Sequence, residues 1–92
     1  MNEQKVVLEL LAMDLRRVAL GIQRGSFAMA KRFADEALKR KQEIDEQRLD
    51  PYMVKLLNSL DNNIVHLEKD RVGEDALMFS VLIQNYALTK CK

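Results

Sequence analysis

The side chain best suited to acid–base chemistry in this sequence is His66, the single histidine. An unperturbed imidazole titrates near neutral pH, and on a helix His66 lies one turn before Asp70, which could accept its proton or share a metal ion with it. A metal site needs further ligands. The sequence has no H-E-x-x-H motif, and Asn63 stands where the E-x-x-H spacing of di-iron bundles requires glutamate. We therefore expect His66 to be a surface or rim residue, with no metal and no other cofactor.

Nucleophilic catalysis is not indicated either. The candidate nucleophiles are Ser26, Ser59, Ser80 and Cys91. None of them lies in a strand–turn–helix elbow, and one histidine would have to serve any of them as the base. A single cysteine also cannot form an intrachain disulfide or a multi-cysteine metal site. We expect a protein that is not an enzyme.

Charge is unevenly distributed along the chain, although the formal net charge is only +1. Residues 16–41 carry eight basic and two acidic side chains, whereas residues 42–75 carry nine acidic and four basic ones. Part of the basic excess could converge near Gly25 as a patch for an anion or a nucleic acid, with Arg16, Arg17, Arg24, Lys31 and Arg32 as its members. A solvated surface is the simpler interpretation, because no groove-reading motif or set of stacking aromatic residues accompanies the charge. RNA binding by residues 16–41 is therefore the alternative function.

The elements that must position these side chains are helices. Apolar residues make up 48% of the 92 residues and recur at helical spacing almost throughout, which predicts an all-α protein with one domain over residues 1–92. We expect helices over about residues 2–24, 27–47, from 51 onwards, and 76–88. Short connections favour a four-helix up-down bundle, although a bent helix or a three-helix arrangement is also possible.

Three local signals set these boundaries. Gly25 can adopt the left-handed conformation that ends a helix, and Ser26 can then cap the next one. Asp50 before Pro51 is a typical start of a third helix. In the second helix, the apolar face is expected to contain Phe27, Ala30, Ala34, Ala37 and Ile44. No apolar run exceeds four residues, so we expect a soluble, cytoplasmic protein with no membrane span.

The fourth expected helix is the most apolar, with ten apolar residues among the thirteen from Ala76 to Leu88. A surface helix needs only one apolar face, so this helix must be either central in the fold or half of an interface. The predicted interface residues are Leu77, Phe79, Val81, Leu82, Ile83 and Tyr86. Two-fold dimers are the commonest oligomers, and the broadly apolar first helix could complete a self-complementary patch. A homodimer acting through protein–protein contacts is thus the first functional hypothesis.

The stretch from Asp14-Leu15 through Gly25 to Phe33-Ala34-Asp35-Glu36-Ala37-Leu38-Lys39 resembles the helical hairpin of HEPN domains, which are four-helix bundles that accompany minimal nucleotidyltransferases. The resemblance covers residues 14–39, about a third of the chain. HEPN ribonucleases carry an arginine and then a histidine with four to six residues between them, and here Ser59, Leu60 and Asp61 occupy those arginine positions before His66. The resemblance therefore implies a HEPN-like, non-catalytic bundle that dimerises or binds a partner protein.

Overall fold

The computed structural model describes residues 3–64, 67 and 71–90 of the chain. Within these residues the protein contains helices and no strand, which confirms the all-α prediction. The elements are α1 (Glu3–Gln23), α2 (Phe27–Lys41), the short 3-10 helix η1 (Glu46–Arg48), α3 (Pro51–Ile64) and α4 (Val72–Lys90).

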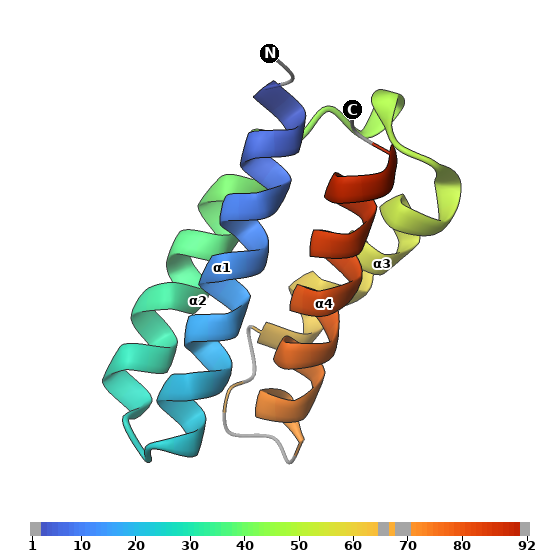
Figure 1. Ribbon diagram of the computed structural model, residues 1–92. Coiled ribbons are helices and arrows are strands. Elements are labelled where there is room, and N and C mark those ends of the chain that lie inside the picture. Colours follow the sequence, from blue (N-terminus) through green and yellow to red (C-terminus); the bar gives the residue numbers. More distant parts are fainter. Residues whose placement is uncertain (1–2, 65–66, 68–70, 91–92) are drawn as a thin grey trace.

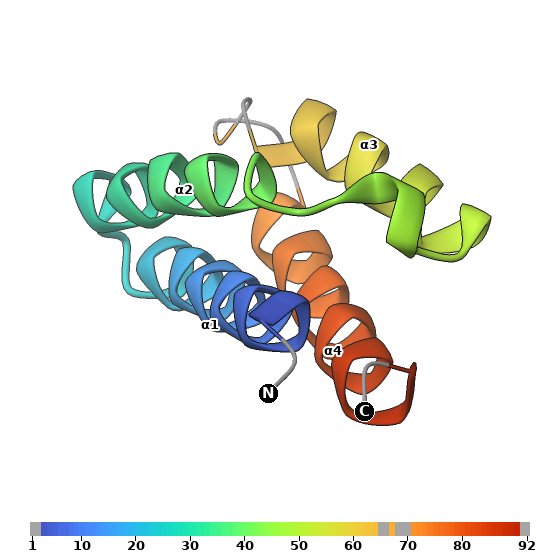
Figure 2. The same cartoon turned by 90° about the horizontal axis from the view of Figure 1, so that it is seen from above.

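Consecutive helices run in opposite directions, so the predicted four-helix up-down topology is confirmed (Figure 1). The four helices are not equally close to one another. Seen from above, α1 lies beside both α2 and α4, whereas α3 packs on α4 and has few contacts with α2 (Figure 2). The fold is therefore built around α1, which carries most of the helix–helix packing.

The core is made by one apolar stripe from each helix. Apolar residues three and four apart share a helix face, and such a stripe is buried on α1 and on α3. The side chains with no more than 1% exposure on these two helices are Leu8, Leu11, Leu15, Val18, Met53, Leu57, Leu60 and Ile64. The middle stripe of α2 consists of Ala30, Ala34 and Ala37, which are also buried.

Small residues let α1 and α2 approach closely. A Cβ placed on Gly21 would lie 2.7 Å from the backbone nitrogen of Ala30, so no larger residue fits at this crossing without a shift. The connection between the two helices has the predicted caps. Gly25 has φ +74°, in the left-handed region, and the Met29 amide donates to the Ser26 hydroxyl at 3.2 Å.

The second helix ends at Lys41, earlier than the expected boundary near residue 47. The amides of residues 42–44 donate to carbonyls three residues earlier, which tightens the chain out of the α-helix. Asp45 is extended and caps η1 through the Gln47 amide at 3.1 Å. Gln4 of α1 then holds this bend, since its side chain accepts from the Asp45 amide at 2.9 Å and donates to the Asp45 carbonyl at 3.1 Å.

The fourth helix begins at Val72, before the expected start at Ala76. Gly73, expected in the connection, is part of the helix, and a Cβ there would lie 3.2 Å from the Cγ2 atom of Ile22. Val72 itself is buried. The first turn of α4 is therefore used for packing against the end of α1.

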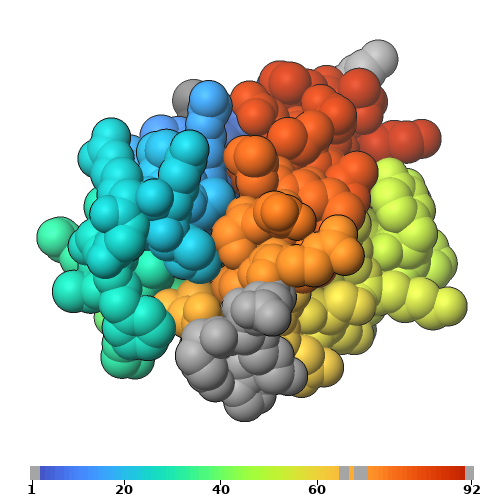
Figure 3. Space-filling view, turned by 90° about the horizontal axis from the view of Figure 1, so that it is seen from below, coloured from blue at the N-terminus to red at the C-terminus, as the bar shows by residue number. Residues whose placement is uncertain are grey.

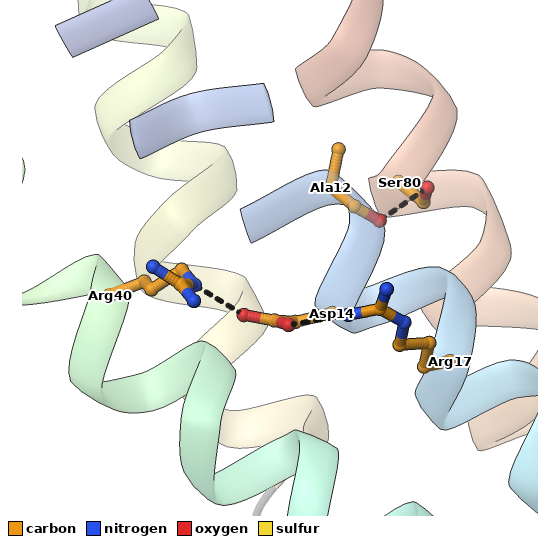
Figure 4. Close-up of polar contacts among 5 residues, drawn as sticks. All are labelled: Ala12, Asp14, Arg17, Arg40 and Ser80. Atoms are coloured by element: carbon orange, nitrogen blue, oxygen red, sulfur yellow. Dashed lines mark hydrogen bonds and ion pairs between the residues drawn. The ribbon is translucent and has the colours of Figure 1, made fainter. Parts of the chain in front are cut away.

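Two ion pairs tie α2 to its neighbours. The Asp14 carboxylate on α1 is almost completely buried and accepts from the Arg40 Nε atom of α2 at 2.7 Å, while Arg17 lies 3.7 Å away on its other side (Figure 4). In the same last turn of α2, the Lys41 Nζ atom donates to Asp61 of α3 at 2.6 Å. A buried carboxylate needs such partners, because without them its desolvation would cost several kcal/mol.

Candidate functional site

The outward side of α4 is the most apolar exposed surface among the described residues. Five of its large apolar side chains are 42–53% exposed. These are Leu77, Met78, Val81, Leu82 and Leu88. At about 100° per residue, Leu77, Val81 and Leu88 form one stripe, and Met78 and Leu82 form the next stripe around the helix. This helix therefore presents apolar side chains to solvent along most of its length.

The fourth helix also supplies core residues, and the structure divides the six predicted interface residues between the two roles. Phe79, Ile83 and Tyr86 are buried, at 7%, 0% and 5% exposure. Tyr86 also accepts a hydrogen bond from the Asp50 amide at 3.0 Å, which fixes the start of α3 against α4. The other three, Leu77, Val81 and Leu82, remain exposed and available to a partner.

The first helix extends the exposed surface across the groove between α1 and α4. Met13 is 47% exposed and lines a hollow of about 150 Å³ together with Ser80 and Gln84 of α4. Glu9, Ala12 and Arg16 complete the α1 side of this hollow. We call Val6, Met13, Leu77, Val81 and Leu88 the α1/α4 face.

A buried hydrogen bond holds the two helices of this face in register. The Ser80 hydroxyl donates to the Ala12 carbonyl at 2.8 Å, and Ser80 is only 4% exposed (Figure 4). Bonding to a helical carbonyl satisfies the serine where a larger side chain would separate the helices. This hydrogen bond joins α1 and α4 at the floor of the groove, beside Met13 and Gln84.

A larger hollow lies at one end of the same groove. It has a volume of about 410 Å³ and is lined mainly by apolar atoms of the last turns of α1 and the first turns of α4. Its lining residues are Ala19, Ile22, Gln23, Arg71, Gly73, Glu74 and Leu77. Figure 3 shows this end of the molecule, with α1 in blue beside the start of α4 in orange. Leu77 belongs to both the hollow and the α1/α4 face, so the two surfaces are continuous.

The five residues of the expected basic patch are spread over different parts of the surface. Arg17 and Arg32 both lie over the Phe33 ring, with guanidinium carbons 5.3 and 5.7 Å from its centre. Arg16 lines the groove between α1 and α4 instead, and Lys31 lines a hollow between α2 and α3 and pairs with Asp35 at 3.8 Å. Arg24 is exposed near the turn. The structure therefore brings Arg17 and Arg32 together on the Phe33 ring, whereas Arg16 and Lys31 line two other hollows.

No cluster of three potential metal ligands occurs in the part of the chain that the structure describes. Three residues considered for chemistry in the sequence, His66, Asp70 and Cys91, lie outside that part. Of the candidate hydroxyls, Ser26 is a helix cap and Ser80 a helix-packing residue. None of the described helices is long and apolar enough to cross a membrane.

Some residues of the α1/α4 face were not singled out from the sequence. The sequence did not predict Val6, Met13 and Leu88 to be exposed, because each stands close to residues of a buried apolar stripe. Glu9 and Arg16 gave a detectable signal, since opposite charges seven residues apart fall on one side of a helix. Only the position of α4 shows that this side borders a groove.

Comparison of the chain with protein-family models, with curated proteins and with solved structures finds no match to any of them.

Proposed function

We propose that this protein is a non-enzymatic, cytoplasmic helical bundle that acts through protein–protein contacts, and that it forms a homodimer through α4 and α1. One observation carries the proposal. Of the nine large apolar side chains exposed among the described residues, seven lie on these two helices, and the two others are Phe27 and Tyr52. The resemblance of residues 14–39 to HEPN bundles agrees with a non-catalytic role of this kind.

The exposed apolar surface is concentrated on α1 and α4. Single exposed apolar residues are normal, but a contiguous apolar patch is typical of an interaction site. Covering it gains about 25 cal/mol for each Å² of apolar surface removed from water. A second copy of the chain is always present at matching concentration, and two-fold pairing covers the same patch on both copies at once.

Sedimentation equilibrium at tens of micromolar tests the oligomeric state directly. We expect a mass of twice the 10.7 kDa of one chain. Leu77→Glu should give a folded monomer, because Leu77 is 47% exposed and a charge there cannot be buried in the interface. The matched control is Phe27→Glu, which changes a similarly exposed residue on α2 and should leave the dimer intact.

Ile83→Glu on the same helix should behave differently from Leu77→Glu. Ile83 is completely buried, so an unpaired charge there should unfold the protein rather than dissociate it. Circular dichroism distinguishes the folded monomer expected for Leu77→Glu from the unfolded chain expected for Ile83→Glu. A wild-type mass near 10.7 kDa at tens of micromolar would contradict the proposed homodimer.

A second candidate function is RNA binding, favoured by the two guanidinium groups that share the Phe33 ring. These two arginines and the exposed Arg24 carry positive charges that can neutralise phosphates of a nucleic-acid backbone. We would measure RNA binding at low salt for the wild type and for the variant Arg24→Glu/Arg32→Glu, which leaves the Asp14 ion pairs intact. Loss of binding in the variant, with a steep salt dependence in the wild type, would support this function. No binding by the wild type at low salt would remove it.

A further inference from the structure

The outer stripe of α1 has a chemical pattern that is complementary to its own reverse: apolar residues face apolar residues, and each charge faces the opposite charge. Along the exposed side of this helix the order is Val6, Glu9, Met13, Arg16 and Leu20. Apolar residues stand at both ends, opposite charges stand on either side of the centre, and Met13 is the centre. The spacings of three and four residues keep all five on one side of the helix. Such a stripe is self-complementary when a second copy crosses it in the opposite direction.

The two charges of this stripe have no neutralising partner among the described residues. The ion pairs found there involve neither Glu9 nor Arg16. Seven residues of helix separate the two side chains by about 10 Å along the axis, which is too far for them to pair with each other in one chain. Both line the hollow beside Ser80 and Gln84, next to Met13.

Resting on the homodimer proposed above, we infer that two copies pack through the α1/α4 face about a two-fold axis at Met13, so that Glu9 of each copy pairs with Arg16 of the other. A two-fold axis perpendicular to α1 sets the two helices antiparallel. It brings Met13 onto its own counterpart and exchanges the ends of the stripe, so that Val6 of one copy packs near Leu20 of the other. One interface thus contains two symmetry-related ion pairs around an apolar centre.

The same rotation brings opposite ends of α4 from the two copies close to each other. On α4, which runs antiparallel to α1, Leu77 and Leu88 stand at opposite ends of the apolar stripe. An antiparallel partner therefore directs its Leu88 end toward the Leu77 end, where the hollow of about 410 Å³ lies. The hollow is a place for apolar side chains of the second copy to enter.

Charge reversal tests this arrangement, with the dimer dissociation constant measured by sedimentation. In Glu9→Arg, and equally in Arg16→Glu, both ion pairs are replaced by like-charge contacts, and we expect each variant to dissociate at least about tenfold more readily than the wild type. An equimolar mixture of the two variants regains complementary charges across the interface. We expect this mixture to form a heterodimer about as tight as the wild-type dimer, and the double variant to form a normal homodimer.

The outcomes separate this inference from the proposed homodimer. Circular dichroism serves as the folding control, because neither Glu9 nor Arg16 is buried. If the wild type dimerises and both single variants dimerise equally well, or if the mixture fails to recover affinity, the two-fold arrangement at Met13 is overturned while the homodimer stands. If the wild type remains a monomer, the homodimer itself is overturned, and with it this arrangement.

Discussion

At the scale of single residues, Leu60 and Leu82 show how burial decides the role of one residue type. Leu60 is completely buried on α3, whereas Leu82 is 42% exposed on α4. Leu60→Ala should lower the free energy of unfolding by about 2–5 kcal/mol, because it removes apolar contacts and leaves a cavity. Leu82→Ala should cost less than about 1 kcal/mol at a concentration where the protein is monomeric. Urea denaturation of the two variants measures both values, and a loss below about 1 kcal/mol for Leu60→Ala would contradict its place in the core.

Gly21 gives a second prediction at this scale. Alanine normally stabilises a helix interior relative to glycine by about 0.5–1 kcal/mol. Here the added Cβ would meet the backbone of Ala30 at 2.7 Å, so we expect Gly21→Ala to destabilise the protein by about 1–3 kcal/mol instead. Thermal unfolding measures the sign of the change. An increase in stability would mean that α1 and α2 can separate without loss.

At the scale of the elements, the buried ion pair between α1 and α2 should behave as a coupled unit. Asp14 has a side chain only 4% exposed, so Arg40→Ala leaves a carboxylate with Arg17 as its remaining neighbour, at 3.7 Å. We expect a loss of about 1–3 kcal/mol for Arg40→Ala, and a double-mutant cycle with Asp14→Ala should show clear non-additivity. The control is the exposed ion pair Lys31–Asp35, for which a double-mutant cycle should give a coupling free energy below about 0.5 kcal/mol. Equal coupling in the two cycles would show that burial of Asp14 does not matter.

The elements also show what the sequence could and could not predict. The apolar stripes of α1 and α3 were predictable, because polar residues flank each stripe and give it a definite side. The cap at Ser26 and the start of α3 at Pro51 were predictable from the residue types. From Ala76 to Leu88 ten of the thirteen residues of α4 are apolar, so periodicity could not separate buried Ile83 from exposed Leu82. Phe27, expected on the buried face of α2, is 57% exposed, because α3 has few contacts with α2. The distance between α2 and α3 is set by the packing of all four helices, so no local sequence pattern predicts it.

At the scale of the whole molecule, the two-fold arrangement makes a geometric prediction about Met13. A residue on the axis is the only kind that meets its own counterpart, so Met13→Cys in a Cys91→Ser background should form a disulfide-linked dimer under mild oxidation. A disulfide requires Cα atoms about 4.4–6.8 Å apart. Lys39→Cys on the exposed side of α2 is the control and should remain unlinked. Non-reducing electrophoresis reads the result, and cross-linking of both variants alike would contradict a defined axis.

The hydrogen bond from Ser80 to Ala12 joins residues 68 positions apart, and it lies where α1 packs against α4. The α1–α2 hairpin can close early, since its contacts are local, but α1 cannot cover its remaining apolar side until α4 arrives. Contacts between distant residues require a large loop to close and slow the folding of a chain. During synthesis, therefore, one apolar side of α1 stays uncovered while about fifty further residues are made, which takes several seconds at typical rates of synthesis. Among the described helices, α4 completes the packing and is synthesised after the other three, so the surface proposed to bind a second copy forms only after α4 has docked on α1.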